Sequence, residues 1–192
     1  MEEIEVKILG IDKDSIEQKL VSVGAEKTFD AEINAFYYDF PDMLLKRHGA
    51  VLRLRLEGNN PVIPYKGSVG HVCGIGKELE NCVKKYPSRA EGKVKVLNEL
   101  ETSLENFDAM RKILEGIGMV CWFKMRKRRI SYALEEAHFE LDKYLGEYDF
   151  VPWFLEIECS DSEALFSYAE QLGFKREDCK PWSFPEVVEY YS

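Results

Sequence analysis

The sequence predicts an α+β fold in which an eight-stranded antiparallel β-barrel forms a tunnel and helices pack on its outside. Three observations support this prediction: about eight segments alternate apolar and charged residues, three helical segments run from a capping residue to a glycine, and many of the strands follow one another closely. A chain of 192 residues is long enough for one sizeable core, so we expect a single domain over residues 1–192.

The strands are recognised by an alternation of period two. The stretch EIEVKI, from Glu3 to Ile8, places three aliphatic residues on one face and three charged residues on the other. The same criterion predicts strands over residues 2–9, 33–39, 50–57, 61–66, 94–103, 119–132, 137–143 and 153–159.

The helices share one pattern, which is a capping residue, helical spacing of apolar residues and a terminal glycine. The segment DKDSIEQKLVSVGA begins at Asp12 and reaches Gly24. The segments NFDAMRKILEGIGM and SDSEALFSYAEQLGF repeat the pattern, and PEVVEYY predicts a short helix near the end of the chain.

The remaining segments are predicted as connections. FPDMLLKRHG, EGNNP and EYDFVP are expected to be loops. The stretch 67–92 is rich in glycine, and we expect a mobile excursion there with a helical piece at IGKELENCVKKY. We expect Trp122, Trp153 and Trp182 to lie in the core.

Composition excludes several classes of partner. The formal charge of −9 argues against nucleic acid and anionic membranes as partners, and no apolar run is long enough to span a membrane. The five cysteines are scattered without CxxC spacing, and the acidic start of the chain does not resemble a signal peptide. We therefore expect a cytoplasmic protein with reduced cysteines. Whether it forms a homodimer stays open.

Charged residues recur on one face of the predicted strands, and the opposite face is aliphatic. The aliphatic face requires burial under the helices, which leaves the charged face to line a cavity. Carboxylates in such a cavity suit hard cations such as Mg²⁺ or Mn²⁺, and guanidinium and ammonium groups suit phosphate oxygens. A cavity with both kinds of group matches a complex of a metal ion with a polyphosphate.

Two other interpretations are compatible with single strands. A half-exposed antiparallel sheet also alternates charged and apolar residues, and the charges of a purely structural barrel would pair with one another. The agreement of six strands favours the cavity. The register of the basic strand is open, because a slip of one residue would turn Lys124, Arg126 and Arg128 inward in place of Lys127 and Arg129.

These segments resemble a known family in order along nearly the whole chain. EIEVKI resembles the ExExK signature of the CYTH superfamily, the triphosphate tunnel metalloenzymes, which includes class IV adenylate cyclases, thiamine triphosphatases and inorganic tri- or polyphosphatases. YYDFPDMLLKRHGAVLRLR resembles the family's Tyr-Asp stretch and paired-arginine strand, and YKG its lysine-glycine strand end. NELETSLENFDAMRKILEGIGM, RKRRISY, FELD and FLEIE resemble the later elements.

The resemblance implies a tunnel that binds a triphosphate and a divalent metal, Mg²⁺ or Mn²⁺. It implies that Lys7 and Glu5 carry catalysis. The implied metal ligands are Glu3, Glu5 and Glu158, with Asp142 and Glu156 as further candidates. The implied phosphate ligands are Lys7, Arg53, Arg55, Lys66, Lys127 and Arg129. Further acidic residues expected in the tunnel are Glu99, Glu101 and Glu140.

The chain departs from the family pattern at three positions. Leu97 and Asn98 stand where the family often has charged residues, and Pro64 lies within the lysine-bearing strand. Proline removes a backbone donor and is normally an edge or bulge residue in a sheet. These departures bear on the phosphate contacts and the substrate more than on the fold.

The leading functional hypothesis is metal-dependent hydrolysis of a triphosphate compound, which would be inorganic triphosphate, thiamine triphosphate or a nucleoside triphosphate. One alternative is a class IV adenylate cyclase that makes cyclic AMP from ATP. The other is a module that binds polyphosphate or a nucleotide without turnover. The sequence leaves open the substrate, the choice between hydrolase and cyclase, and the preferred metal.

Overall fold

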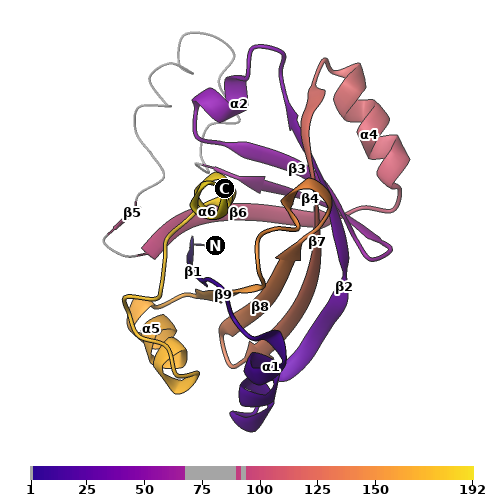
Figure 1. Ribbon diagram of the computed structural model, residues 1–192. Helices are drawn as coiled ribbons and strands as arrows, with labels where there is room; N and C mark the ends of the chain where they lie inside the picture. The colour runs from indigo at the N-terminus through magenta and orange to yellow at the C-terminus, as the bar shows by residue number, and fades with distance from the viewer. Residues whose placement is uncertain (1, 68–89, 92–93) are drawn as a thin grey trace. The chain divides into compact units, whose positions relative to one another are not determined.

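A computed structural model describes the backbone of residues 2–67, 90–91 and 94–192, and the side chains of residues 4–67 and 100–192 (Figure 1). The chain divides into two units. Unit 1 contains residues 1–2, 33–89 and 97–125, and unit 2 contains residues 3–32, 90–96 and 126–192. Three strands, β2, β6 and β7, continue from one unit into the other, and β1 does so by its first residue, Glu2.

The sheet of unit 2 has the strand order β1-β9-β8-β7-β2. Its strands are β1 (Glu2–Ile8), β9 (Phe154–Cys159), β8 (Ala137–Tyr144) and the parts of β7 (Val120–Leu134) and β2 (Glu26–Asp39) that belong to this unit. The pairs β1–β9, β9–β8 and β8–β7 are antiparallel. Residues opposite each other in these pairs share one face of the sheet.

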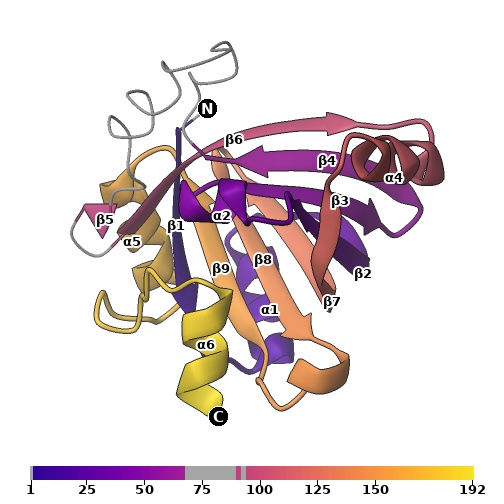
Figure 2. The same ribbon diagram turned by 90° about the horizontal axis from the view of Figure 1, so that it is seen from above.

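Helices α1 (Lys13–Ser22) and α5 (Ser162–Gln171) cover the aliphatic face of this sheet. Figures 1 and 2 show both helices on one side of β8 and β9. Each helix begins after an aspartate whose side chain accepts a hydrogen bond from the backbone N–H three residues on. This N-cap satisfies a donor of the first turn that has no partner within the helix. The core between helices and strands includes Val6, Leu20, Ile157, Leu165 and Leu172.

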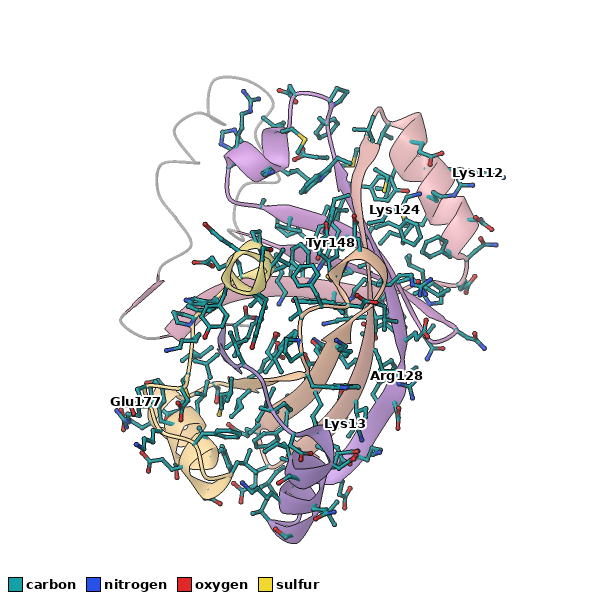
Figure 3. All side chains as sticks on the ribbon, in the orientation of Figure 1. Lys13, Lys112, Lys124, Arg128, Tyr148 and Glu177 are labelled. Atoms are coloured by element: carbon teal, nitrogen blue, oxygen red, sulfur yellow. The ribbon has the colours of Figure 1, made fainter. Side chains whose placement is uncertain are left out.

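Helix α6 (Phe184–Tyr191) lies on the other side of β8 and β9 (Figure 2). The ring of Phe184 meets the ring of Tyr144 at 5.0 Å and that of Tyr148 at 4.9 Å, in edge-to-face geometry. Tyr148 belongs to the short helix η1 (Gly146–Tyr148) and lies beside α6 in Figure 3. Just before α6, Lys180 exchanges two backbone hydrogen bonds with Lys7 of β1, each of 2.8 Å.

The sheet of unit 1 has the order β7-β2-β3-β4-β6. It adds β3 (Val51–Glu57), β4 (Asn60–Lys66) and the larger part of β6 (Val94–Ser103). Its aliphatic face packs against α4 (Phe107–Gly116) and α2 (Leu44–Arg47) through a second core that includes Tyr38, Leu54, Leu114 and Met119. Beyond it, the two-residue strand β5 (Ala90–Glu91) pairs with β6 within unit 2.

Pro64 occupies an inner strand, because β4 pairs with both β3 and β6. The ladder to β3 accommodates the missing N–H: it has pairs at Leu52–Tyr65 and Arg55–Val62 but none between them. The expectation of an edge or bulge residue is therefore wrong for the described strands, and the ladder is interrupted at the proline.

The antiparallel pairing and the helices on the apolar faces confirm the predicted α+β fold class. The described residues contain nine strands, the eight predicted and β5.

Helices α2 and η1 lie in segments that were predicted as loops. The predicted excursion at 67–92 lies outside the described residues except for Gly67, Ala90 and Glu91. Among the described helices, none is long and apolar enough to cross a membrane.

Candidate metal and phosphate site

The charged face of unit 2 is assembled by the strand register. Lys7 on β1 lies opposite Glu156 on β9, which in turn lies opposite Glu140 on β8. One step along, Glu5 lies opposite Glu158. The alternation that predicted each strand therefore brings the charges of neighbouring strands together on one surface.

Lys7 is enclosed by carboxylates. Its Nζ lies 2.7 Å from Oε2 of Glu156 and 3.5 Å from Oε1 of Glu5, and only 6% of the residue is exposed. Burial alone would lower the pKa of Lys7, but the negative charges of Glu156 and Glu5 raise it above the usual value. The ammonium group therefore stays protonated at neutral pH and serves as a fixed positive charge.

Asp142 is fully buried and holds the two cations of β7. Its carboxylate accepts a hydrogen bond of 2.7 Å from Nζ of Lys127 and bonds of 2.8 Å and 2.5 Å from Nε and Nη2 of Arg129. Arg129 also pairs with Glu140. Burial lowers the pKa of Lys127, and the neighbouring Arg129 lowers it further. The bidentate contact fixes the plane of the guanidinium group.

This arrangement resolves the register of the basic strand. Lys127 and Arg129 are buried on the charged face, and the exposed Lys124 and Arg126 are not part of it. Arg128 pairs with Asp30 at the surface. The slip of one residue that the sequence left open does not occur.

Carboxylates gather in two overlapping clusters. One consists of Glu5, Glu156 and Glu158, and the other of Glu140, Asp142 and Glu156; in each, the candidate ligand oxygens lie within 4.8 Å of one another. Burial would raise the pKa of Glu156, but the positive charges of Lys7, Arg129 and Lys127 lower it well below its usual range. Burial raises the pKa of Glu140 to about 7, against the opposing charge of Arg129.

The donor set suits a divalent metal ion. All candidate ligands in the clusters are carboxylates, without histidine or cysteine, which is the chemistry that hard cations prefer. Glu156 belongs to both clusters, so its carboxylate could serve as a ligand in either of them. The described residues therefore offer groups that could hold one or two such ions.

Unit 1 carries a second row of charges on the corresponding face of its own strands. Arg53 and Arg55 are two residues apart on β3 and therefore share a face with Val51 of the same strand. Lys66 of β4 lies directly opposite Val51, so it belongs to that face as well. Arg55 is buried and pairs with Glu57 at 2.9 Å and with Glu101 of β6. This row combines guanidinium, ammonium and carboxylate groups, as predicted from the sequence.

The predicted site residues with described side chains differ in burial. Those that are buried are Glu5, Lys7, Arg55, Lys127, Arg129, Asp142 and Glu156. Those that are half-buried are Arg53, Lys66, Glu140 and Glu158, and Glu101 is exposed. The side chains of Glu3, Leu97, Asn98 and Glu99 lie outside the described residues. In unit 2 the charged face is thus not the wet surface of a half-exposed sheet.

Two acidic residues of unit 1 that are at least half-buried were not predicted as site residues. Glu57 continues the alternation of Arg53 and Arg55 by two residues, so the period-two pattern would have indicated it. Asp39 is 1% exposed and accepts backbone N–H bonds from Phe40, Leu45 and Lys46, which fixes the turn before α2. Its role depends on a local chain reversal that alternation does not encode.

Comparison with known proteins agrees with this description. The CYTH domain model matches residues 1–180, and the chain belongs to the CYTH domain family. The family resemblance predicted from the sequence is thereby confirmed. No curated protein gives a significant match to the sequence.

Solved structures share the fold at low sequence identity. A Vibrio parahaemolyticus protein described as a candidate adenylate cyclase has a TM-score of 0.73 at 20% identity, covering 97% of both chains. A Pyrococcus horikoshii protein has a TM-score of 0.68 at 24% identity, covering 96% of this chain and 98% of its own. A Hippeastrum protein, described as a candidate adenylyl cyclase with a dominant triphosphatase activity, has a TM-score of 0.62 at 17% identity, covering 98% and 95%.

Proposed function

We propose that the protein hydrolyses a triphosphate compound with the help of Mg²⁺ or Mn²⁺. The observation that carries this proposal is the buried charged face of unit 2, where clustered carboxylates and three cations lie on neighbouring strands. A site for a polyphosphate and a hard metal ion requires both kinds of group at close range.

The proposed division of roles follows from charge. Glu5, Glu156 and Glu158 would hold a metal ion, with Glu3, Glu140 and Asp142 available for a second. A divalent ion bound there supplies neutralisation of phosphate charge and activation of the attacking nucleophile. Lys7, Lys127 and Arg129 would bind phosphate oxygens, and Arg53, Arg55 and Lys66 are the proposed phosphate ligands of unit 1.

Hydrolysis forms a bond from a water oxygen to phosphorus and breaks the bridging P–O bond, so negative charge grows on the leaving oxygen. Lys7 remains protonated because of its carboxylate neighbours, and its fixed charge stabilises that oxygen. The same high pKa makes Lys7 a poor proton acceptor. We therefore assign Lys7 an electrostatic role. The proton of the attacking water would be accepted by solvent or by a carboxylate.

A panel of substrates tests this proposal. Purified protein with Mn²⁺ or Mg²⁺ is incubated with tripolyphosphate, thiamine triphosphate or ATP, and released phosphate is measured. We expect release that depends on metal, is lost with a chelator and is lost in Glu5→Gln but not in Glu170→Gln, an exposed carboxylate on α5. The proposal would be refuted if the protein neither turned over any of these triphosphates nor bound one in the presence of metal.

Adenylate cyclase activity is the second candidate. It is favoured by the descriptions of the Vibrio parahaemolyticus protein and of a Bacillus halodurans protein, both as candidate adenylate cyclases, whereas the Hippeastrum protein is described as mainly a triphosphatase. The same charges would serve either reaction, since only the nucleophile differs. Cyclic AMP as the main product from ATP would favour the cyclase, and binding without any product would favour a binding module.

A further inference from the structure

An aromatic cluster lies on unit 1, formed by Tyr37 of β2 and by Trp122 and Phe123 of β7. The ring of Tyr37 is 5.1 Å from that of Phe123 and 6.0 Å from that of Trp122, and the Trp122 and Phe123 rings are 5.6 Å apart. Trp122 is 39% exposed. The expectation that this tryptophan lies in the core is therefore wrong.

The cluster is separate from the core of unit 1. Phe36 and Tyr38, the neighbours of Tyr37 along β2, pack into the core beneath α4. Because successive side chains of a strand point to opposite faces, Tyr37 points to the face opposite that core. The core of unit 1 includes none of Tyr37, Trp122 and Phe123, so their contacts with one another are not part of the packing of α4 against the sheet.

Tyr37 connects the cluster to the proposed phosphate ligands. It lies directly opposite Arg53 in the antiparallel pair of β2 and β3, which places their Cβ atoms about 4.5–5.5 Å apart on one face. Arg55 follows two residues along the same face. A half-buried tyrosine, in contact with the exposed Trp122, therefore adjoins the start of a row of guanidinium groups within a single unit.

A cation completes the cluster. Nζ of Lys46, on α2, lies 4.6 Å from the centroid of the Trp122 ring. It would attract an electron-rich or anionic group beside the indole and repel a cationic ring such as a thiazolium.

We propose that the aromatic cluster binds the base of the substrate, so that the preferred substrate is a nucleoside triphosphate. This inference rests on the proposed function, because it assumes that Arg53 and Arg55 bind phosphates. A nucleotide joins its base to its phosphates through a single sugar, which suits recognition by side chains at neighbouring positions of adjacent strands. Bases of every kind stack on aromatic side chains. Inorganic triphosphate has no aromatic group that could stack on the cluster. Thiamine triphosphate would bring the positive charge of its thiazolium ring beside the ammonium group of Lys46, and the two would repel each other.

The test compares ATP with tripolyphosphate in the full-length protein with Mn²⁺. We expect Trp122→Ala to raise the KM and the Kd for ATP by about tenfold or more, since loss of one stacking contact typically has that effect. The values for tripolyphosphate should stay within about twofold, because that ligand does not reach the cluster. Trp122→Phe should retain most of the affinity for ATP. The matched control is Val120→Ala, which is 43% exposed on the same strand.

Binding is read independently of turnover, from the shift in melting temperature that each ligand causes. Equal weakening for ATP and tripolyphosphate would show a structural role for Trp122 and overturn the inference, as would unchanged affinity for ATP. If wild-type protein binds tripolyphosphate but not ATP, the inference fails and the proposed function stands. If it binds neither, both fail.

Discussion

Lys7 and Glu156 form a buried ion pair across β1 and β9, with 2.7 Å between Nζ and Oε2 at directly opposed positions of the two strands. Both residues are more than nine-tenths buried. Removing two charges from water is costly, and a buried pair is often no more stable than well-packed apolar residues of similar size. Stability alone therefore does not explain the pair, and the proposed function accounts for it as part of a phosphate and metal site.

The first prediction separates these two explanations. Lys7→Met should lower the free energy of unfolding by about 3–5 kcal/mol, because it leaves Glu156 buried beside Glu5 without its cation. The double variant Lys7→Met/Glu156→Met should recover most of that loss, since it removes both charges of the closest pair and leaves only Glu5 without Lys7. Urea unfolding measures both values. If the double variant is as unstable as the single one, the pair serves stability.

Alternation within the sequence was sufficient to predict eight of the nine described strands, all except the two-residue β5. Each segment such as EIEVKI or VLRLRLEG carries an aliphatic face that needs cover and a charged face that does not, and the observed strands begin and end within a few residues of the predictions except β2, which starts seven residues earlier. Capping residues likewise marked helices α1, α4 and α5. Asp12 accepts the expected backbone N–H, and the structure shows that Asn106 and Asp161 cap the other two.

Contacts between distant segments could not be predicted in this way. Alternation indicates that Arg129 and Asp142 belong on charged faces, but only the pairing of β7 with β8 makes them partners. Helix α2 has four residues and depends on the buried carboxylate of Asp39, so no periodic signal reveals it. The aromatic cluster likewise arises from the adjacency of β2 and β7, and the isolated Trp122 gave no sign of it.

The second prediction concerns the metal ligands. Glu158→Gln should weaken Mn²⁺ binding by about tenfold or more, because it removes a negative charge from the cluster with Glu5 and Glu156. Isothermal titration calorimetry measures the affinity. Glu170→Gln, on the surface of α5, is the matched control and should leave it unchanged. Equal affinity in wild type and Glu158→Gln would exclude this residue as a ligand.

The third prediction contrasts a buried acceptor with an exposed one. Asp142→Asn should lower the free energy of unfolding by about 3–5 kcal/mol, because Lys127 and Arg129 lose their shared carboxylate in the interior. Asp14→Asn removes an ion pair of 2.5 Å with Lys13 whose aspartate is 80% exposed, and should cost at most about 1 kcal/mol. Chemical denaturation of both variants checks the contrast. Similar losses in the two variants would contradict the view that the buried carboxylate of Asp142 stabilises the fold by accepting hydrogen bonds from Lys127 and Arg129.

The fourth prediction concerns acid stability. Burial acts to raise the pKa of Glu17, but hydrogen bonds from Lys13, Tyr132 and Lys27 lower it from 4.5 to about 2. A carboxylate whose pKa falls on folding contributes stability above its unfolded pKa and loses that contribution as the pH drops through the folded pKa. Glu17→Gln should therefore be less stable than wild type by about 1–2 kcal/mol at neutral pH, and the difference should vanish between pH 4.5 and pH 2. A constant difference across this range would contradict the lowered pKa.

The most direct measurement is metal-dependent phosphate release from a triphosphate by wild type and by Lys7→Met/Glu156→Met, with melting temperatures recorded for both. We predict that wild type releases phosphate only with Mg²⁺ or Mn²⁺, and that the double variant still melts in one cooperative transition and has lost the activity. A folded double variant that retains activity would contradict the assignment of this charged face as the catalytic site.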